Sequence, residues 1–323
     1  MRAAYYRRKG AAADVLEVGE VDTPTPAPGE VRVRVAASGV NPSDVKKRQG
    51  MDLEFPTIIP HSDGAGEVDA VGDGVPESRI GERVWTINGQ WRRPHGTAAE
   101  YIAIGSDYAI PLPEGTAEAA GACLGIPVLT AYRALTLDGD VSGQTLLVPG
   151  GAGAVGHYVV QIAKLQGATV IATVSSAEKA AHARAGGADH TIDYKTENVG
   201  ERVQEITGGR GVDRIVEVDL GGNAGLIPDV LRPEGTVVVY GSTPPAAQIP
   251  AVWCVRNDIT FRFFIMYQLT DEVRDACAVA VNELLKAGSL RHTIAETYPL
   301  ADIVKAHEAV ESGKVMGNIV VTL

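Results

Sequence analysis

The sequence predicts an α/β protein in which a doubly wound parallel sheet is joined to a second, mostly β domain. Strand and helix patterns alternate from Gln144 to about Met266, as expected for a parallel sheet covered on both faces. The segment before Leu112 contains short β-rich stretches separated by Gly and Pro. The chain of 323 residues is also longer than one hydrophobic core usually supports, so we expect two domains.

Composition and charge argue against a membrane-spanning protein and against a nucleic-acid partner, although a local basic patch stays possible. Hydrophobic residues make up 45% of the chain, yet no apolar run approaches the ~20 residues needed to cross a bilayer. The net charge of −11 argues against binding to nucleic acid. The N-terminus MRAAYYRRKG lacks the apolar core of a signal peptide, so we expect a cytoplasmic protein. Cys123, Cys254 and Cys277 show no zinc-cluster spacing and are expected to be free thiols.

The N-terminal domain, expected over residues 1–122, is predicted to be a series of strands with turns between them. The alternation of Val31, Val33 and Val35 is typical of a half-buried strand. The Pro-rich segment 23–30 is expected to form a stiff surface connection. Further strands are predicted at Ala3–Tyr6, Val15–Val18, Gly64–Val71, Arg83–Asn88 and Ala98–Ile104.

A helix over Ala117–Leu135 is expected to lead into the second domain, residues 123–267. The strands of this domain are predicted near residues 145–149, 169–174, 190–193, 212–218, 235–240 and 259–265. Residues 268–323 predict helices over Asp271–Ala287 and Leu300–Ser312 and a strand over Asn318–Thr322. This tail is too short for a core of its own, so we expect it to pack on the N-terminal domain.

The most specific motif is the glycine-rich turn between the strand near Leu147 and the helix that follows it. Gly151, Gly153 and Gly156 fit the pattern G-x-G-x-x-G. In this pattern the first glycine allows the turn, the second lets a pyrophosphate approach, and the third lets the helix pack on the strand. The helix N-terminus would then hold the two phosphates. The alternative is a glycine-rich turn with no ligand.

The end of the next strand indicates which dinucleotide is bound. NAD-dependent enzymes usually carry Asp or Glu there to accept from the ribose 2′-OH. This chain has Ser175, Ser176, Ala177, Glu178 and Lys179 instead. Two hydroxyl groups and a lysine suit a 2′-phosphate and favour NADPH, although Lys179 could simply lie on a solvated helix face.

Several sequence blocks, in this order, resemble the medium-chain dehydrogenase/reductase superfamily over nearly the whole chain. They are GVNPSD at 39–44, PHSDGAGEVDAVG at 60–72, VLTAYRAL at 128–135, the glycine turn, GADHTIDY at 187–194 and the closing YPLADIVKAHEAVESGKVMGNIVV. Within the superfamily the chain is similar to the zinc-free quinone oxidoreductase branch, the zeta-crystallin-like enzymes. The resemblance implies a GroES-like catalytic domain, a Rossmann domain that binds NADPH, and a homodimer formed along the edge of the Rossmann sheet.

The resemblance allows a zinc site to be tested by position. Zinc-dependent relatives carry cysteine at the position of Asn41, His-Glu at Ser62 and Asp63, and cysteine at Ile126. Asparagine, serine and isoleucine do not form a zinc site. We therefore expect no metal, and we expect His61 to be a structural residue or to lie at the rim of a pocket.

The resemblance also implies which residues bind the cofactor. Ser176, Lys179 and Tyr194 fall at the positions around the 2′-phosphate, and Asn41 lies beside the nicotinamide. The remaining cofactor residues are expected to be Thr130, Gly151, Ala152, Gly153, Ala154, Val155, Ser175, Gly241, Ser242, Phe264, Ile265, Met266 and Asn318.

Lys46 departs from the branch, in which a tyrosine that faces the substrate is often found at this position. A lysine could bind an anionic substrate, or it could be solvated beside Lys47 and Arg48. We favour the second interpretation because three consecutive cations usually mark a wet surface. The substrate pocket is expected to include Asn41, Lys46, His61, Trp253, Phe264 and Tyr267, although core packing explains the aromatic residues equally well.

Without a metal, a conjugated acceptor is the expected substrate, because its developing negative charge is delocalised. We therefore expect an NADPH-dependent reductase of quinones or α,β-unsaturated carbonyl compounds, with Asn41 as a donor to the developing oxyanion. One alternative is a reductase of acidic or thioester enoyl substrates. Another is an NADPH-binding protein without catalytic activity. The sequence identifies no proton donor.

Overall fold

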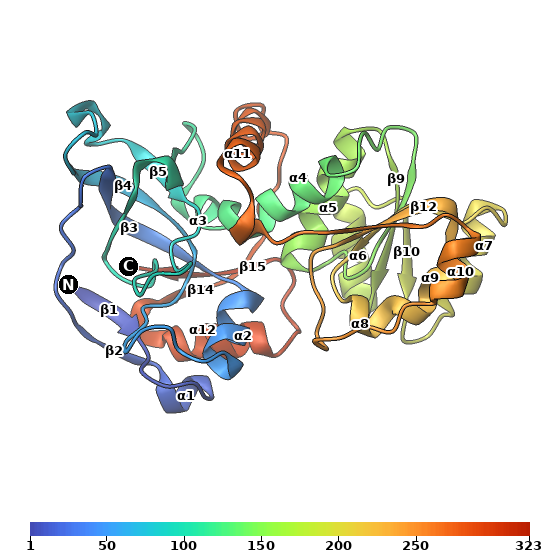
Figure 1. Ribbon diagram of the computed structural model, residues 1–323, viewed down its shortest axis with the longest axis horizontal. Coiled ribbons are helices and arrows are strands. Elements are labelled where there is room, and N and C mark those ends of the chain that lie inside the picture. The colour runs from blue at the N-terminus through green and yellow to red at the C-terminus, as the bar shows by residue number, and fades with distance from the viewer. The chain divides into compact units, whose positions relative to one another are not determined.

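The computed structural model describes residues 1–323 and contains two compact units. Unit 1 comprises Met1–Pro127 and Ala278–Leu323, and unit 2 comprises Val128–Cys277 (Figure 1). The divisions fall five and ten residues after the expected boundaries at 122/123 and 267/268. None of the helices combines the length and the apolar character that crossing a bilayer requires.

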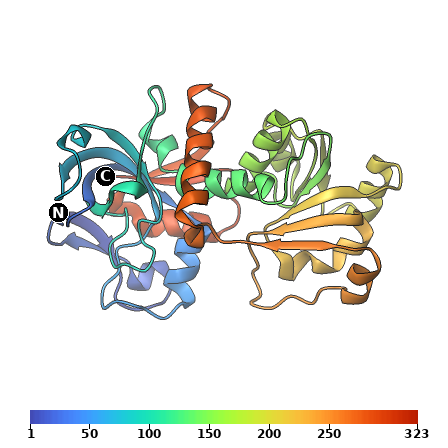
Figure 2. The same ribbon diagram turned by 45° about the horizontal axis from the view of Figure 1, so that its top comes forward.

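Unit 2 is built on a parallel sheet of six strands in the order β10-β9-β8-β11-β12-β13 (Figure 2). The strands are β8 (Thr145–Val148), β9 (Thr169–Val174), β10 (His190–Asp193), β11 (Val212–Glu217), β12 (Leu231–Val239) and β13 (Thr260–Phe263). The chain begins at β8, adds two strands on one side and then three on the other. The predicted doubly wound sheet is confirmed. Such sheets bind ligands outside the carboxyl ends of the strands, where the strand order reverses.

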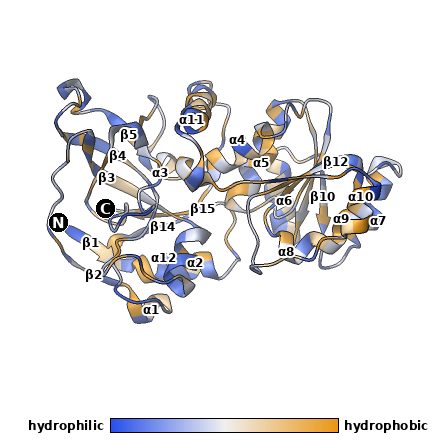
Figure 3. Cartoon of the chain, in the orientation of Figure 1, coloured by the Kyte–Doolittle hydropathy of each residue, from blue (hydrophilic) through white to orange (hydrophobic).

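Helices accompany the strands of unit 2 and bury the centre of the sheet. They are α4 (Leu129–Thr136), α5 (Ala154–Leu165), α6 (Ala177–Ala185), α7 (Val199–Thr207), α8 (Leu220–Asn223), α9 (Ile227–Val230) and α10 (Ala251–Arg256). Hydrophobic residues dominate α5, which is buried from Gly156 to Ala163 (Figure 3). Leu147, Ile171 and Val237 are fully buried in the sheet, which explains why these strands read as continuous apolar runs.

Unit 1 contains a seven-stranded sheet with the order β14-β15-β3-β4-β5-β7, in which β6 also pairs with β3. The strands are β3 (Glu30–Val40), β4 (Asp63–Val71), β5 (Arg83–Thr86), β6 (Tyr101–Gly105), β7 (Ala109–Pro111), β14 (Ile294–Pro299) and β15 (Asn318–Thr322), while β1 (Arg2–Tyr5) and β2 (Glu17–Glu20) form a separate pair. The C-terminal strand β15 pairs antiparallel with β3, and Val320 lies opposite Gly39. The expected packing of the tail on the N-terminal segment is confirmed.

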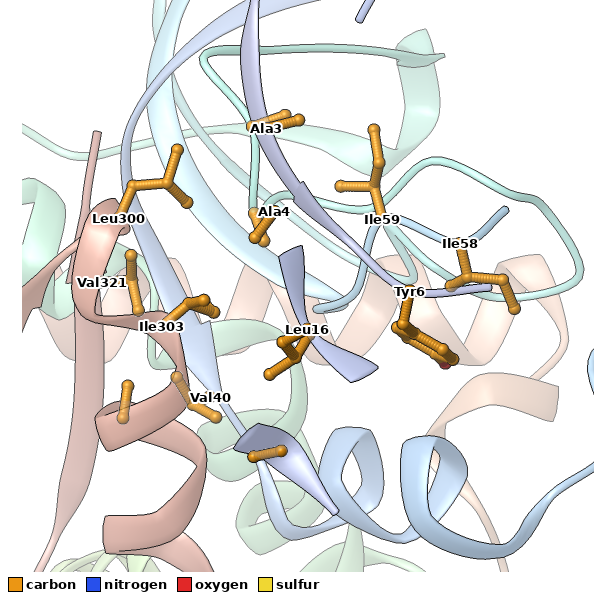
Figure 4. Packing of buried hydrophobic residues seen from close by; sticks show 14 of the residues in the cluster. Ala3, Ala4, Tyr6, Leu16, Val40, Ile58, Ile59, Leu300, Ile303 and Val321 are labelled. Atoms are coloured by element: carbon orange, nitrogen blue, oxygen red, sulfur yellow. The ribbon is translucent and has the colours of Figure 1, made fainter. Parts of the chain in front are cut away.

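The main core of unit 1 collects side chains from both ends of the chain (Figure 4). Tyr6, Val40, Ile59, Ile303 and Val321 are at most 5% exposed. Helix α12 (Ile303–Glu311) contributes its apolar face to this core, and the same buried face carries a histidine. Helix α11 (Asp271–Lys286) comes before α12 in the sequence, and the division of the chain between the two units falls within it, at Cys277 and Ala278.

One helix prediction and one strand prediction are corrected by the structure. The expected helix over Ala117–Leu135 is divided into α3 (Glu118–Gly121), a π-helical turn at Leu124–Val128 and α4. Pro127 lies inside the π-helical turn. Proline cannot donate the backbone hydrogen bond of a regular α-helix, which accounts for the interruption at this point. Val15 ends the short helix α1 (Ala12–Val15) instead of starting a strand. Helix α2 (Pro42–Gly50) and strand β14 are absent from the sequence-based predictions.

Candidate functional site

The glycine-rich turn connects β8 to α5 at the carboxyl end of the parallel sheet. β8 ends at Val148, and Gly150 follows with a φ of 68°, in the left-handed region that favours glycine. Gly153 is the N-cap of α5. The prediction that Gly151 provides the conformational freedom of the turn is therefore wrong, because the left-handed residue is Gly150.

The other glycines control how closely the backbone segments approach. A Cβ on Gly151 would lie 2.6 Å from the Cβ of Ala172 in β9, and a Cβ on Gly156 would lie 2.3 Å from the carbonyl oxygen of Gly150. At Gly153 the nearest atom is the same oxygen, at 3.3 Å, and no other atom lies within 4 Å. The space beside Gly153 is thus open at the N-terminus of α5, where backbone N–H groups and the helix dipole suit a pyrophosphate.

The residues expected at a 2′-phosphate lie at the ends of two adjacent strands. Ser176 caps α6 directly after β9, and the Lys179 N–H donates to Ser176 Oγ over 3.2 Å. Tyr194 follows β10, is exposed, and donates its backbone N–H to the Val174 oxygen over 3.1 Å. Ser175 and Lys179 are half-buried. Three hydroxyl-bearing residues and a lysine therefore lie at neighbouring strand ends, and this set of side chains suits a phosphate better than a ribose hydroxyl.

A pocket of about 700 Å³ lies at the carboxyl ends of β12 and β13. Gly241, Ser242, Phe264 and Ile265 line it, and all four are expected around the nicotinamide half of the cofactor. The structure thus brings these residues together from two neighbouring strand ends, on the edge of the sheet that also carries the glycine turn.

Other residues expected near the nicotinamide or the substrate lie inside unit 2. Thr130 on α4, Met266 and Tyr267 are buried. Trp253 packs against the hydrophobic core of the sheet. Neither Tyr267 nor Trp253 lines the pocket at Phe264. The structure therefore favours the interpretation that these aromatic residues serve in packing.

In unit 1, Asn41 joins two buried carboxyl groups. Asn41 is the N-cap of α2, and its backbone N–H donates to Asp44 Oδ2 over 2.8 Å. Its carboxamide Nδ2 donates to Asp63 Oδ2 over 2.8 Å, and the Ile126 N–H donates to the same oxygen over 3.0 Å. These contacts hold both the backbone and the side chain of Asn41 and leave its second Nδ2 proton for another acceptor.

Burial shifts the pKa of both carboxyl groups toward the neutral form. It raises the pKa of Asp44 to about 6, and it raises the pKa of Asp63 well above its ordinary value. One oxygen of each group, Oδ1, is buried without a hydrogen-bond partner. The environment of Asn41 is therefore less negative than two fully ionised carboxylates would make it.

His61 lies in the interior of unit 1, which corrects its assignment to a substrate pocket. Its ring Nδ1 lies 2.8 Å from Ser38 Oγ, and its Nε2 lies 3.0 Å from Nε2 of His307. The two ring planes are tilted by only 23°, and their centroids lie 5.1 Å apart. Burial lowers the pKa of His61 to about 3, so the ring is neutral at neutral pH. Its φ of 77° is left-handed, which costs a non-glycine residue about 1–2 kcal/mol.

The three consecutive cations of α2 do not share one environment. Lys46 is exposed, but Lys47 is half-buried and Arg48 is fully buried. Lys47 Nζ donates to the Gln90 carbonyl over 3.0 Å, and Arg48 pairs with Glu311 of α12. The prediction of a wet surface is therefore wrong for Arg48 and Lys47, because successive residues of a helix point to different sides.

Asn318, which is expected at the cofactor, belongs to unit 1 together with Asn41. It is buried at the start of β15, and its Nδ2 donates to the Thr293 carbonyl over 3.2 Å. No three His, Cys, Asp or Glu side chains converge in an arrangement that could hold a metal ion.

Four buried residues around this site are missing from the sequence-based set: Ser38, Arg48, Thr97 and His307. The only local signal in the region is the spacing of Asn41 and Asp44, which is that of a capping box. The four missing residues come from separate segments, so no local pattern connects them.

Replacing Gly156 by alanine is expected to raise the dissociation constant of NADPH about tenfold or more. The new Cβ would collide with the Gly150 carbonyl, and relieving such overpacking costs about 1–3 kcal/mol. Isothermal titration calorimetry measures the change. Gly225→Ala is the control, because no atom lies within 4 Å of its Cβ. Equal affinities of both variants and the wild type would contradict a phosphate site at this turn.

In His61→Asn, the free energy of unfolding is expected to fall less steeply as the pH is lowered than it does in the wild type. The folded pKa of about 3 lies below the ordinary 6.5, so unfolding takes up a proton between these values and the free energy of unfolding falls as the pH falls. Removing the ring should reduce this slope by about 1.4 kcal/mol per pH unit. Urea denaturation at pH 6, 5 and 4 measures it. Asp44 and Asp63 titrate in the opposite sense in both proteins, so only the difference is diagnostic. Equal slopes would refute the neutral buried ring.

Comparison with known proteins gives the family. The model of the "Alcohol dehydrogenase GroES-like domain" matches residues 27–114, and that of "Zinc-binding dehydrogenase" matches residues 154–282. A 2-haloacrylate reductase from Burkholderia sp. is 32% identical over 99% of this chain and 98% of its own. A quinone oxidoreductase from Pseudomonas aeruginosa is 32% identical over 95% of both chains. The structure of Escherichia coli quinone oxidoreductase complexed with NADPH matches over 100% of both chains, with a TM-score of 0.90 and 27% identity. The chain therefore belongs to the medium-chain dehydrogenase/reductase superfamily, in its quinone oxidoreductase-like branch.

Proposed function

We propose that this protein is an NADPH-dependent, zinc-independent reductase of quinones or α,β-unsaturated carbonyl compounds. The observation that carries the proposal is the open space at Gly153, where the backbone of the turn and the N-terminus of α5 fit a pyrophosphate. The relatives named as quinone oxidoreductase and 2-haloacrylate reductase support the class of acceptor, and the structure solved with NADPH supports the cofactor.

The residues of unit 2 fit the parts of NADPH in order along the carboxyl edge of the sheet. NADPH supplies a hydride from its nicotinamide ring. The backbone of residues Gly151 to Val155 would hold the pyrophosphate, and Ser175, Ser176, Lys179 and Tyr194 would hold the 2′-phosphate. Gly241, Ser242 and the segment Phe264 to Met266 would hold the nicotinamide half, with Thr130 nearby on α4, while Asn318 remains an expected contact from unit 1.

Asn41 is the group that would stabilise the negative charge on the acceptor oxygen. Its carboxamide is held by Asp63, so its second Nδ2 proton has a fixed direction before the acceptor binds. A preorganised donor of this kind contributes about 3–4 kcal/mol to transition-state stabilisation in oxyanion holes. The proton that completes the reduction is not assigned to a residue.

The chemistry of the side chains supports zinc independence. Asn41, Ser62 and Ile126 occupy the positions where zinc-dependent relatives carry ligands, and none of the three is a zinc ligand by type. Asn41 and Ile126 instead donate hydrogen bonds to the same oxygen of Asp63. A metal at this oxygen would have to compete with both donors.

A homodimer and a cytoplasmic location complete the proposal. β13 is an edge strand of the parallel sheet, and Phe263 at its end is exposed. Val252 and Val255 on the adjacent helix α10 are exposed as well. Apolar side chains beside an unpaired strand edge favour pairing with a second copy. Cys123 and Cys277 are buried free thiols, which fits a reducing compartment.

The acceptor range tests the proposed reaction directly. Purified protein is expected to oxidise NADPH with 1,4-benzoquinone or a neutral enone, at a rate that EDTA does not change. The measurement is the loss of NADPH absorbance in steady state. A requirement for added zinc would refute the mechanism, and NADPH binding without turnover of any acceptor would favour a non-catalytic binding protein.

The same assay separates the second candidate function, reduction of acidic enoyl substrates. The relative named 2-haloacrylate reductase and the exposed Lys46 favour this candidate. If it is correct, acrylate-type acids should react faster than neutral enones, and Lys46→Ala should reduce only the rate with acids.

Lys179→Ala is expected to weaken NADPH binding about tenfold or more and to leave NADH nearly unchanged. The lysine would contact the 2′-phosphate, and a charge-assisted hydrogen bond contributes about 1.5–3 kcal/mol. Titration of the variant with both cofactors measures the ratio. Lys195→Ala, which changes an exposed lysine next to Tyr194, controls for net charge. Equal losses of affinity for NADPH and NADH would remove Lys179 from the site.

A further inference from the structure

The buried polar groups around His61 form one continuous chain of hydrogen bonds through unit 1. Arg48, His307, His61, Ser38, Thr97 and Asp63 follow one another in this chain, and all are 0% exposed. The successive distances are 3.4 Å (Arg48 Nε to His307 Nδ1), 3.0 Å (His307 Nε2 to His61 Nε2), 2.8 Å (His61 Nδ1 to Ser38 Oγ), 2.8 Å (Ser38 Oγ to Thr97 Oγ1) and 2.6 Å (Thr97 Oγ1 to Asp63 O).

The Asp63 end of the chain determines the direction of three bonds. A carbonyl oxygen only accepts, so the single hydroxyl proton of Thr97 points to Asp63 O. Ser38 must then donate its own proton to Thr97. Because the Ser38 proton is used, Nδ1 of His61 must carry a proton and donate it to Ser38 Oγ.

The Arg48 end leads independently to the same arrangement. An arginine only donates, so Nδ1 of His307 must be the unprotonated ring nitrogen. The ring proton of His307 is therefore on Nε2 and points to His61. The first derivation leaves a lone pair on Nε2 of His61, which is what this donor requires. A second proton on His61 would point its Nε2–H at the Nε2–H of His307, and a second proton on His307 would point its Nδ1–H at the Nε–H of Arg48. Both rings are therefore neutral.

The chain of hydrogen bonds ends at Asp63, the residue that orients Asn41. Ser38 and Gly39 of β3 pair with Gly64 and Asp63 of β4, so the last links lie against the strand that carries Asp63. The Asp63 main chain accepts from Thr97, and its side chain accepts from the Asn41 carboxamide. A change at His307 would therefore reach Asn41 through the position of Asp63.

We propose that this one-directional chain, with His61 and His307 as positioning residues, fixes the orientation of the Asn41 carboxamide. The left-handed backbone of His61 fits the proposal, because strain of this kind persists only where surrounding contacts hold the residue, and both ring nitrogens of His61 are in hydrogen-bond contact. The role of the oriented amide in catalysis rests on the proposed function, but the positioning itself does not.

The test uses two substitutions of His307. Glutamine can keep both contacts, since its amide nitrogen donates to His61 and its oxygen accepts from Arg48, whereas leucine removes both. Ile303→Val on the same buried face of α12 is the control for lost packing, because it removes one buried methylene group and no hydrogen bond.

The first readout is the side-chain amide signal of Asn41 in protein labelled with ¹⁵N-asparagine, assigned through its loss in Asn41→Asp. We expect it to move in His307→Leu and to stay in His307→Gln and Ile303→Val. Labelled histidine should show protons on Nδ1 of His61 and Nε2 of His307. An unmoved Asn41 signal in His307→Leu, or the opposite tautomer of either ring, would overturn the proposal.

The second readout is kinetic. His307→Leu should lower kcat about tenfold or more, with the NADPH dissociation constant within about twofold of the wild type, and His307→Gln should retain most of the rate. Equal losses in both variants would indicate packing alone and would overturn the proposal. A wild-type protein that reduces no acceptor would refute the proposed function. The amide signals would still decide whether the chain of hydrogen bonds positions Asn41.

Discussion

The hydrogen bond from the Asn41 carboxamide to the Asp63 carboxyl group is the interaction on which the organisation of unit 1 depends. Asp63 is fully buried, and an unsatisfied buried polar group costs about 1–3 kcal/mol. Its Oδ2 accepts from the start of α2 and from the π-helical turn, and its main-chain oxygen accepts from Thr97. Three separate segments must therefore reach this one residue. The requirement for hydrogen-bond partners therefore specifies how these three segments meet, which apolar packing alone does not do.

The sequence predicts unit 2 well, because its constraints are local. Each strand is a short apolar run next to a helical pattern, and β9 and β10 begin and end at the predicted residues. The glycine turn is recognisable because its steric requirements involve residues a few positions apart, such as Gly156 and Gly150. The assignment of the left-handed residue to Gly151 is wrong because the motif gives the spacing of the glycines and not their backbone angles.

Unit 1 is predicted less well, because its decisive contacts join residues that are far apart in the chain. The two lysine neighbours of Arg48 predict that it lies in solvent, yet its partners His307 and Glu311 lie on α12, near the opposite end of the chain. The missing zinc residues predict that His61 is not a ligand, but they do not indicate that its ring is buried against His307 and Ser38. Periodicity indicates which residues are buried in a helix such as α12, and it does not indicate which polar groups meet there.

The positions where zinc-dependent relatives carry their ligands converge in this chain without a zinc-ligand set. Asn41 and Ile126 meet at Asp63 Oδ2, and Ser62 precedes Asp63 in the chain. In the proposed mechanism, amide donors take the part of the positive charge that a metal ion would supply to an acceptor oxygen, and the carboxyl groups beside them have raised pKa values. Raising these pKa values reduces the negative charge that would oppose a developing oxyanion. The neutral rings of His61 and His307, farther along the chain of buried hydrogen bonds, add no charge of either sign. A site of this kind stabilises charge through oriented dipoles, so its effectiveness depends on how firmly Asn41 is held.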